Sequence, residues 1–170
     1  MLTQVTLRTA TPSDYKKMAQ IFVAAYHEYA KVLSAENWQR MQQNLLDVEH
    51  TAKVADFIVA EIENEIVGAI AYYPPGKSNP KYFDSQWASL RLLAVDPQHR
   101  RKGIGKLLTK EGIERAKQDD AKAIALYTSK AMTVAQKMYG SLGFKQVREL
   151  PMMLDLRYWL YVLYLPPERS

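Results

Sequence analysis

The stretch Asp96-Pro-Gln-His-Arg-Arg-Lys-Gly-Ile-Gly-Lys106 decides the fold, because it links a strand-like apolar run to an amphipathic helix through a basic, glycine-containing turn. Residues 88–95 before it are predicted to form a strand, and Ile104–Gln118 after it a helix with one apolar face. The glycines permit a tight turn, while the unpaired amides of the first helical turn point outward. The segment therefore predicts a cradle for an anion such as phosphate.

Positive charge is local in this chain. The net charge is +5, and residues 98–110 alone hold five basic side chains and no acidic one. Residues 1–65 carry 6 basic and 9 acidic side chains, so the first third of the chain is net negative. A local cluster is typical of a phosphate-binding site, and we expect no nucleic acid as a partner. The acidic first third fits a cationic ligand and fits ordinary solvation equally well.

Two other phosphate-binding motifs are excluded by the residues at one or two positions. A dinucleotide-binding fingerprint would need a third glycine at position 108, where the chain has Leu108. A Walker A loop would need glycine at position 100 and Ser or Thr at position 107, where the chain has Arg100 and Leu107. Taken alone, the glycine turn is a weak signal, since a solvated basic turn would look the same.

The composition is that of a soluble globular protein and excludes several chemistries. The chain is 48% hydrophobic and 24% charged and contains no cysteine, so it has no disulfide, thiolate metal site or cysteine nucleophile. Its histidines, at positions 27, 50 and 99, lack metal-ligand spacing, and we expect no metal. Neither a membrane span nor a signal peptide is recognisable, so a cytoplasmic protein with no membrane partner is expected.

Strand and helix patterns alternate along the whole chain. Strands are predicted at residues 5–8, 55–61, 65–73, 88–95, 123–128, 146–154 and 158–165. Helices are predicted from the Thr11-Pro-Ser-Asp14 cap through Tyr29, and at residues 36–46, 104–118 and 133–142. This order predicts one α/β domain over residues 1–170, in which helices cover both faces of a mixed, mostly antiparallel sheet to give three layers.

Two motifs in the second half resemble those of the GNAT superfamily of acetyl-CoA-dependent N-acetyltransferases. Arg100-Arg-Lys-Gly103-Ile-Gly105, preceded by Leu92-Leu-Ala-Val-Asp-Pro97, looks like the family's Arg/Gln-x-x-Gly-x-Gly/Ala motif. Ala135-Gln-Lys-Met-Tyr139-Gly-Ser-Leu-Gly-Phe144 looks like its Ala-x-x-x-Tyr-x-x-x-Gly-Phe motif. The resemblance implies a GNAT-like fold, with acetyl-CoA as co-substrate.

The resemblance also implies which residues hold the co-substrate. Backbone groups of Leu93 would reach the acetyl carbonyl, those of Val95 the pantetheine, and the amides of the basic turn the pyrophosphate. Lys137 could add a cation on the next helix, or simply be a solvated lysine. The predicted co-substrate residues are Leu93, Ala94, Val95, Arg100, Arg101, Lys102, Gly103, Ile104, Gly105, Lys106 and Lys137.

Tyr139 has two interpretations. Its spacing from Ala135 and Met138 indicates the buried face of a helix, where a tyrosine can be purely structural. The resemblance implies instead that Tyr139 is the general acid that protonates the departing CoA thiolate, while the amine attacks the acetyl group directly in a ternary complex. No acyl-enzyme is needed, since no activated nucleophile is evident. The alternative function is a non-catalytic CoA-binding or acyl-CoA-sensing module.

The chain departs from the family pattern where a general base is expected. Ser89 stands where many relatives have Glu, and a serine cannot deprotonate the amine. Water, Glu28 and His27 remain open as alternatives. Met132 likewise stands at a position that is often Asn.

The acceptor is expected to be the amine of a small molecule or of a peptide. The predicted acceptor-binding residues are Tyr26, Glu28, Tyr29 and Tyr82, with Phe83 and Trp87 from the same aromatic loop, residues 74–87. The aromatic side chains of the last strand are interpreted as core or as the surface of a homodimer; they are Tyr158, Trp159, Tyr161 and Tyr164.

Overall fold

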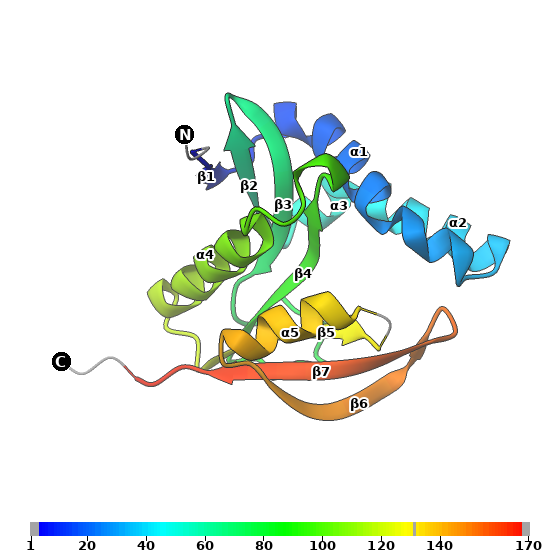
Figure 1. The fold of residues 1–170 in the computed structure, drawn as a ribbon. Helices are drawn as coiled ribbons and strands as arrows, with labels where there is room; N and C mark the ends of the chain where they lie inside the picture. Colours follow the sequence, from blue (N-terminus) through cyan, green and yellow to red (C-terminus); the bar gives the residue numbers. More distant parts are fainter. Residues whose placement is uncertain (1–3, 131, 168–170) are drawn as a thin grey trace.

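One seven-stranded sheet organises the computed structural model, which describes residues 4–130 and 132–167 (Figure 1). The strands lie in the order β1-β2-β3-β4-β5-β7-β6, and every neighbouring pair is antiparallel except the parallel pair β4 and β5. Their bounds are β1 Thr6–Thr9, β2 Asp56–Ile62, β3 Glu65–Tyr73, β4 Trp87–Val95, β5 Ala123–Ser129, β6 Lys145–Met153 and β7 Leu156–Tyr164.

Helices cover both faces of this sheet, as Figure 1 shows. One apolar core joins the sheet to α4 and α5, and a second joins the opposite face to α1, α2 and α3. The predicted three-layer α/β fold is therefore confirmed. The helix bounds are α1 Tyr15–Tyr26, α2 Ala35–Leu46, α3 Val48–Ala52, α4 Ile104–Gln118 and α5 Thr133–Ser141.

Two local elements differ from the sequence prediction. The first helix does not run unbroken to Tyr29: a 3₁₀ turn at Pro12–Asp14 precedes α1, and a second one over His27–Lys31 follows it. The short helix α3 was not predicted. With five residues it is too short to show a 3.6-residue apolar period.

The parallel contact between β4 and β5 is short. It pairs Trp87 with Ala123 and ends at Ser89 with Ala125, although both strands continue. Beyond that point β4 carries an irregularity against β3, and Leu92 adopts a positive φ of 59°. An extra residue bends a strand locally. As a result, the last residues of β4 have a free edge where β5 diverges from them.

Close packing holds α4 against the start of β4. A Cβ atom at Gly112 would lie 2.5 Å from Cδ2 of Leu90, so a larger residue there would displace the buried Leu90 side chain. The helix axis is thereby fixed relative to β4, and the N-terminus of α4 is held beside the free edge.

An ion cluster joins β1 to the first helical turn and to β2. The Arg8 guanidinium donates to both carboxylate oxygens of Asp14, at 2.7 and 2.9 Å, and also pairs with Glu61. Asp14 additionally accepts from the Thr11 amide at 2.8 Å, closing the predicted cap. The hydrogen bonds from Arg8 lower the pKa of Asp14 to about 2.

We expect Asp14→Asn to destabilise the protein by about 1–2 kcal/mol at pH 7, because charge-assisted hydrogen bonds to a half-exposed arginine are lost. Since the pKa of Asp14 is lower in the folded chain, its contribution is complete above about pH 4 and disappears as the pH falls toward 2. Urea unfolding across this range measures the effect. The control is Asp56→Asn, an exposed carboxylate on β2. A difference that does not shrink toward pH 2 would contradict the assignment.

Candidate functional site

The basic turn forms the N-terminus of α4 as predicted. Gly103 precedes the helix with a φ of 77°, and the first helical hydrogen bond runs from the Leu107 amide to the Gly103 carbonyl at 3.1 Å. The amides before Leu107 therefore have no partner within the helix. A Cβ at Gly103 would meet no atom within 4 Å, so open space lies in front of the turn. An anion can approach this backbone directly.

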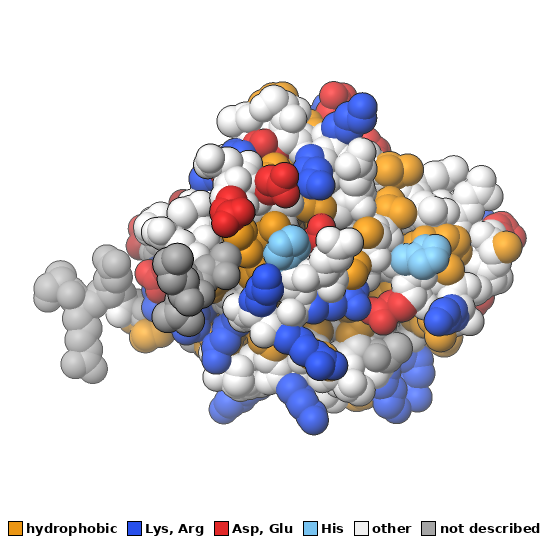
Figure 2. Space-filling view, turned by 45° about the horizontal axis from the view of Figure 1, so that its top comes forward, with side chains coloured by type: hydrophobic (Ala, Val, Ile, Leu, Met, Phe, Trp, Pro, Cys, Tyr) orange, Lys and Arg blue, Asp and Glu red, His pale blue; other side chains and the backbone are white. Residues whose placement is uncertain are grey.

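The cations of the turn are on the surface. Arg101, Lys102 and Lys106 are exposed, and no acidic residue lies in the first turn of α4. Arg100 is also exposed, and it donates a 3.1 Å hydrogen bond to the Ala25 carbonyl at the end of α1. On the face shown in Figure 2, Lys and Arg side chains gather over the lower centre, while most of the visible acidic side chains lie above them. The charge separation in the sequence thus persists in the fold.

Backbone groups of β4 face the gap beside β5. The Asp96 amide donates to the Val67 carbonyl of β3 at 2.8 Å. Because successive amides of a strand point to opposite edges, those of Val95 and Leu93 point away from β3, toward the edge that β5 leaves free. The Leu93 carbonyl accepts a 3.0 Å hydrogen bond from the Tyr26 hydroxyl. α1 is thus tied to the free edge of β4.

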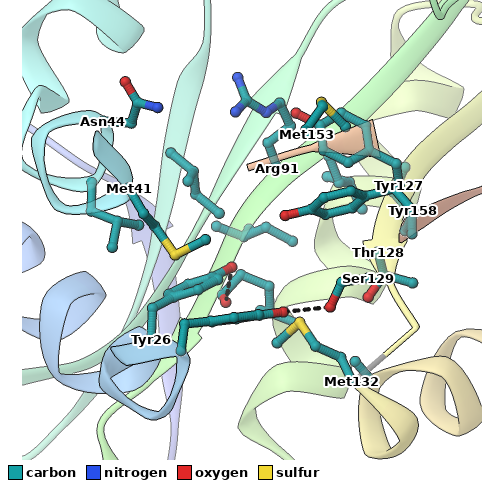
Figure 3. A pocket seen from close by; sticks show the side chains of 18 of the residues that line it. Tyr26, Met41, Asn44, Arg91, Tyr127, Thr128, Ser129, Met132, Met153 and Tyr158 are labelled. Atoms are coloured by element: carbon teal, nitrogen blue, oxygen red, sulfur yellow. Dashed lines mark hydrogen bonds between the residues drawn. The ribbon is translucent and has the colours of Figure 1, made fainter. Parts of the chain in front are cut away.

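A cavity of about 220 Å³ opens beside this edge (Figure 3). Its walls come from the end of α1, from α2, from the diverging strands β4 and β5, from α5 and from the β6–β7 turn. That turn contacts α2, where the side-chain amide of Asn37 donates to the Asp155 carboxylate at 3.1 Å. The lining residues used below are Tyr26, Tyr29, Met41, Arg91, Leu92, Leu93, Tyr127, Thr128, Ser129, Met132, Tyr139, Met153 and Tyr158.

Tyr139 enters the cavity from α5. Its side chain is 7% exposed, and its ring packs edge-on against Phe144 at 5.8 Å. Burial raises the pKa of Tyr139 well above its usual value of 10, so the hydroxyl keeps its proton at any working pH. Within the described part of the chain, no group forms a hydrogen bond with this hydroxyl. It is free to donate to a ligand.

Other hydroxyls line the same cavity. Tyr29 and Ser129 share a short hydrogen bond of 2.6 Å, and burial raises the pKa of Tyr29 and of Tyr26. Thr128 on β5 is buried, and its Oγ1 has no hydrogen-bond partner among the described residues. Because a buried polar atom without a partner is costly, this oxygen is available to a bound molecule.

Ser89, at the position where relatives often have the base, and the two alternative bases, His27 and Glu28, do not line the cavity. Ser89 is fully buried and bonded to the Ser78 hydroxyl at 2.6 Å. The His27 ring packs against Trp38, and Glu28 borders an adjoining hollow beside the start of α5, which shares Tyr29, Met132 and Ala135 with the cavity. No Asp, Glu or His is among the described residues that line the cavity.

The predicted aromatic loop packs one layer behind the cavity wall. Tyr82 and Phe83 contact the ring of Tyr127 at 6.4 and 6.1 Å, and only Tyr127 itself borders the cavity. Trp87 packs against Tyr164 instead. The aromatic rings attract one another and fill the space behind β5, so contact of Tyr82 with an acceptor stays a prediction.

The remaining predicted positions are spread around the site. Lys137 is exposed on α5, and Met132 lines the cavity. Of the last-strand aromatics, Tyr158 lines the cavity, Tyr161 is buried and Tyr164 is 63% exposed. A homodimer stays a prediction. Among the described residues, no group of acidic or histidine side chains could hold a metal ion, and no helix is long and apolar enough to cross a bilayer.

Sequence reasoning missed a second set of cavity residues. Arg91 and Tyr127 face the same space from two strands that diverge, and Met41 and Met153 approach from α2 and from the end of β6. One signal was present in the sequence: Arg91 is the single charged residue in the mostly apolar strand at 88–95.

Comparison with known proteins places the chain in one family. A family model described as the acetyltransferase (GNAT) family matches residues 15–144. The chain belongs to this family. The resemblance seen in the two sequence motifs is therefore confirmed.

The relatives share only part of their length with this chain. It is 36% identical over 93 residues to an N-acetylaspartate synthetase of Danio rerio, covering 55% of this chain and 30% of that protein. It is 31% identical over 108 residues to a Xenopus laevis protein named as an N-acetyltransferase, camello, covering 62% and 47%. The chain thus spans less than half the length of these relatives.

Solved structures share the whole fold. A GNAT family acetyltransferase from Brucella melitensis, crystallised in complex with acetyl-CoA, superposes with a TM-score of 0.67 at 22% identity, covering 99% of this chain and 92% of that one. At this level of identity the likeness concerns the fold.

We expect Gly103→Val to weaken acetyl-CoA binding at least 10-fold, because a β-branched side chain disfavours a φ of 77° and would fill the open space before the turn. Isothermal calorimetry measures the affinity. Gly76→Val is the matched control, since Gly76 has a φ of 84° in a loop away from the turn. A folded Gly103→Val protein with unchanged affinity, or an equal loss in the control, would show that the cradle lies elsewhere.

Proposed function

We propose that this chain transfers the acetyl group of acetyl-CoA to the primary amine of a small molecule. The observation that carries the proposal is the continuity of three features: the anion cradle of α4, the free amides at the end of β4, and the unpartnered Tyr139 hydroxyl in the adjoining cavity. In this arrangement the cradle holds the pyrophosphate, and the Leu93 amide donates to the acetyl carbonyl. Developing negative charge on that oxygen is stabilised by such a donor.

The proposed reaction joins the amine nitrogen to the carbonyl carbon and breaks the carbon–sulfur bond. The ammonium first loses one proton to solvent, because only the neutral amine has a lone pair. As the amide forms, the nitrogen gives up a second proton. Tyr139 protonates the departing sulfur and takes an equivalent proton back, so the products are the amide, the CoA thiol and one released proton.

Water is the proposed base for the first of these protons. The lining offers no carboxylate or imidazole among the described residues, and Ser89 is buried in a bond with Ser78. An amine that reaches the cavity as a neutral group needs no base there. The rate is then expected to increase with pH until the amine itself is neutral in solution.

The size of the cavity supports a small acceptor. At about 220 Å³ it is below the roughly 300–1,000 Å³ of pockets for drug-sized ligands, and the β6–β7 turn closes it toward α2. A small amine fits beside the thioester more readily than a folded protein surface does. Of the two acceptor classes that the sequence left open, we therefore propose the small molecule.

Tyr139→Phe is expected to lower kcat by about 10²-fold while leaving acetyl-CoA affinity nearly unchanged, because the ring stays and only the proton donor is lost. CoA release with an amine panel measures kcat, and calorimetry measures affinity. Full turnover in Tyr139→Phe, with a lower melting temperature, would assign Tyr139 a structural role.

Tyr72→Phe is the matched control for this substitution. Tyr72 is buried away from the cavity, and its hydroxyl donates to Asp119 at 2.7 Å. Losing that hydrogen bond should cost about 1 kcal/mol of stability and leave turnover unchanged. If the wild-type protein binds acetyl-CoA and releases no CoA with any amine, it is the non-catalytic binding module instead.

A further inference from the structure

Arg91 is the single charged side chain among the described residues that line the cavity. It projects from β4, two residues before Leu93, and is partly buried. Figure 3 shows it at the opposite end of the cavity from Ser129 and Met132. Arg91 has no role in the acetyl transfer proposed above.

Among the described residues, the ring contact and the side-chain hydrogen bond of Arg91 are both with tyrosines. Its guanidinium lies 5.6 Å from the ring centroid of Tyr127 and makes a long hydrogen bond of 3.5 Å to the Tyr73 hydroxyl. No ion pair to Arg91 exists within residues 4–130 and 132–167, although Arg8, Arg40, Arg115 and Arg157 each pair with a carboxylate. A partly buried cation with several unused donors is therefore left facing the cavity.

The charge on Arg91 persists despite burial. Burial acts to lower the pKa of the guanidinium, while the nearby Tyr127 and Tyr73 hydroxyls act to raise it, and the net direction is upward. A planar guanidinium binds a carboxylate through two parallel hydrogen bonds, and this geometry is strongest where water is partly excluded. The cavity thus offers one site for one anionic group.

We propose that Arg91 binds the carboxylate of the acceptor, which is an amino acid with an apolar side chain. The inference rests on the acetyltransferase function proposed above. Arg91 and Leu93 line the same cavity of about 220 Å³, so an acceptor that reaches both Arg91 and the thioester beside Leu93 is small and carries its carboxylate and amine close together. Amino acids have this arrangement, and simple polyamines lack the anion.

The rest of the wall selects the side chain. Met41, Met153 and the rings of Tyr127 and Tyr158 line the cavity together with Arg91, and none of them carries a charge. A second carboxylate or an ammonium on the acceptor would be buried there without a charged partner of its own, and this is costly. A leucine-like or phenylalanine-like side chain instead buries apolar surface against the methionines and aromatic rings.

The test compares L-leucine with isopentylamine, which differs from it only by the missing carboxylate. The wild-type protein is expected to use leucine with a kcat/KM at least 10²-fold higher than isopentylamine, and at least 10-fold higher than L-aspartate or putrescine. Arg91→Met should lower kcat/KM for leucine at least 10²-fold and change that for isopentylamine less than about 3-fold. Arg91→Lys, which keeps the charge, should recover part of the loss for leucine.

Product binding separates this inference from the proposed function. With CoA present, N-acetyl-L-leucine should bind the wild-type protein at least 10-fold more tightly than N-isopentylacetamide, and Arg91→Met should abolish the difference even if no turnover is found. Calorimetry measures both. Arg40→Met, which removes an exposed arginine of α2, is the control and should change neither ligand.

Three results would overturn the inference: equal use of leucine and isopentylamine by the wild-type protein, a preference for aspartate or putrescine over leucine, or an equal loss of both leucine and isopentylamine turnover in Arg91→Met. The last result would indicate that Arg91 only supports Tyr127. Selective binding of N-acetyl-L-leucine without turnover by the wild-type protein would support Arg91 as the carboxylate site and would count against the proposed function alone.

Discussion

The early end of the β4–β5 pairing is the constraint on which the site depends. The pairing with β5 stops at Ser89, and beyond the bulge at Leu92 the last residues of β4 border the cavity instead of a neighbouring strand. Buried peptide groups need hydrogen-bond partners, so groups other than β5 must supply them along this edge. The Tyr26 hydroxyl donates a hydrogen bond to the Leu93 carbonyl. The amides of Leu93 and Val95 remain available to a ligand. The point at which β4 and β5 separate therefore determines the positions of both the anion cradle and the cavity.

The two ends of the site differ in their electrostatics. The basic turn before α4 is exposed, so its cations are hydrated and screened, and the backbone amides supply the directed contacts there. In the cavity, burial keeps Tyr26, Tyr29 and Tyr139 neutral, and Arg91 acts in surroundings of low polarity where one charge has a strong effect. One short strand and its flanking helices can thus bind a phosphate-bearing group at one end of the site and a small acceptor at the other.

Local patterns in the sequence predicted the parts of the site that depend on local geometry. Gly103 was recognised because a glycine between a strand and a helix marks a turn, and its positive φ confirms the reason. The buried position of Tyr139 followed from its spacing to Ala135 and Met138 on one helix. The acceptor wall was harder to predict, because the convergence of Arg91 and Tyr127 depends on the divergence of two strands. Apolar periodicity indicates which residues of a helix or strand are buried. It does not indicate which neighbouring strands diverge from each other.

Packing between elements explains where Glu28 and Tyr82 lie. The helix gives way to a 3₁₀ turn at His27, and Glu28 borders a hollow next to the cavity, so its contact with an acceptor stays a prediction. Tyr82 was expected to cover a ligand because it lies in a long aromatic loop. In the fold, the attraction between rings places it behind Tyr127.

The sheet has unpaired strand edges in two very different settings, and this bears on how the protein avoids self-association. The inner edge of β4 lies beneath α1, so the strand of another molecule cannot reach it. The outer strands of the sheet are β1 and β6, and β6 is open to solvent, where it exposes Val147 and Met152. Pro151 removes one donor from that edge, and the exposed Lys145, Arg148 and Glu149 oppose alignment with a neighbouring strand. Two copies of this chain are therefore guarded against joining their sheets end to end through β6.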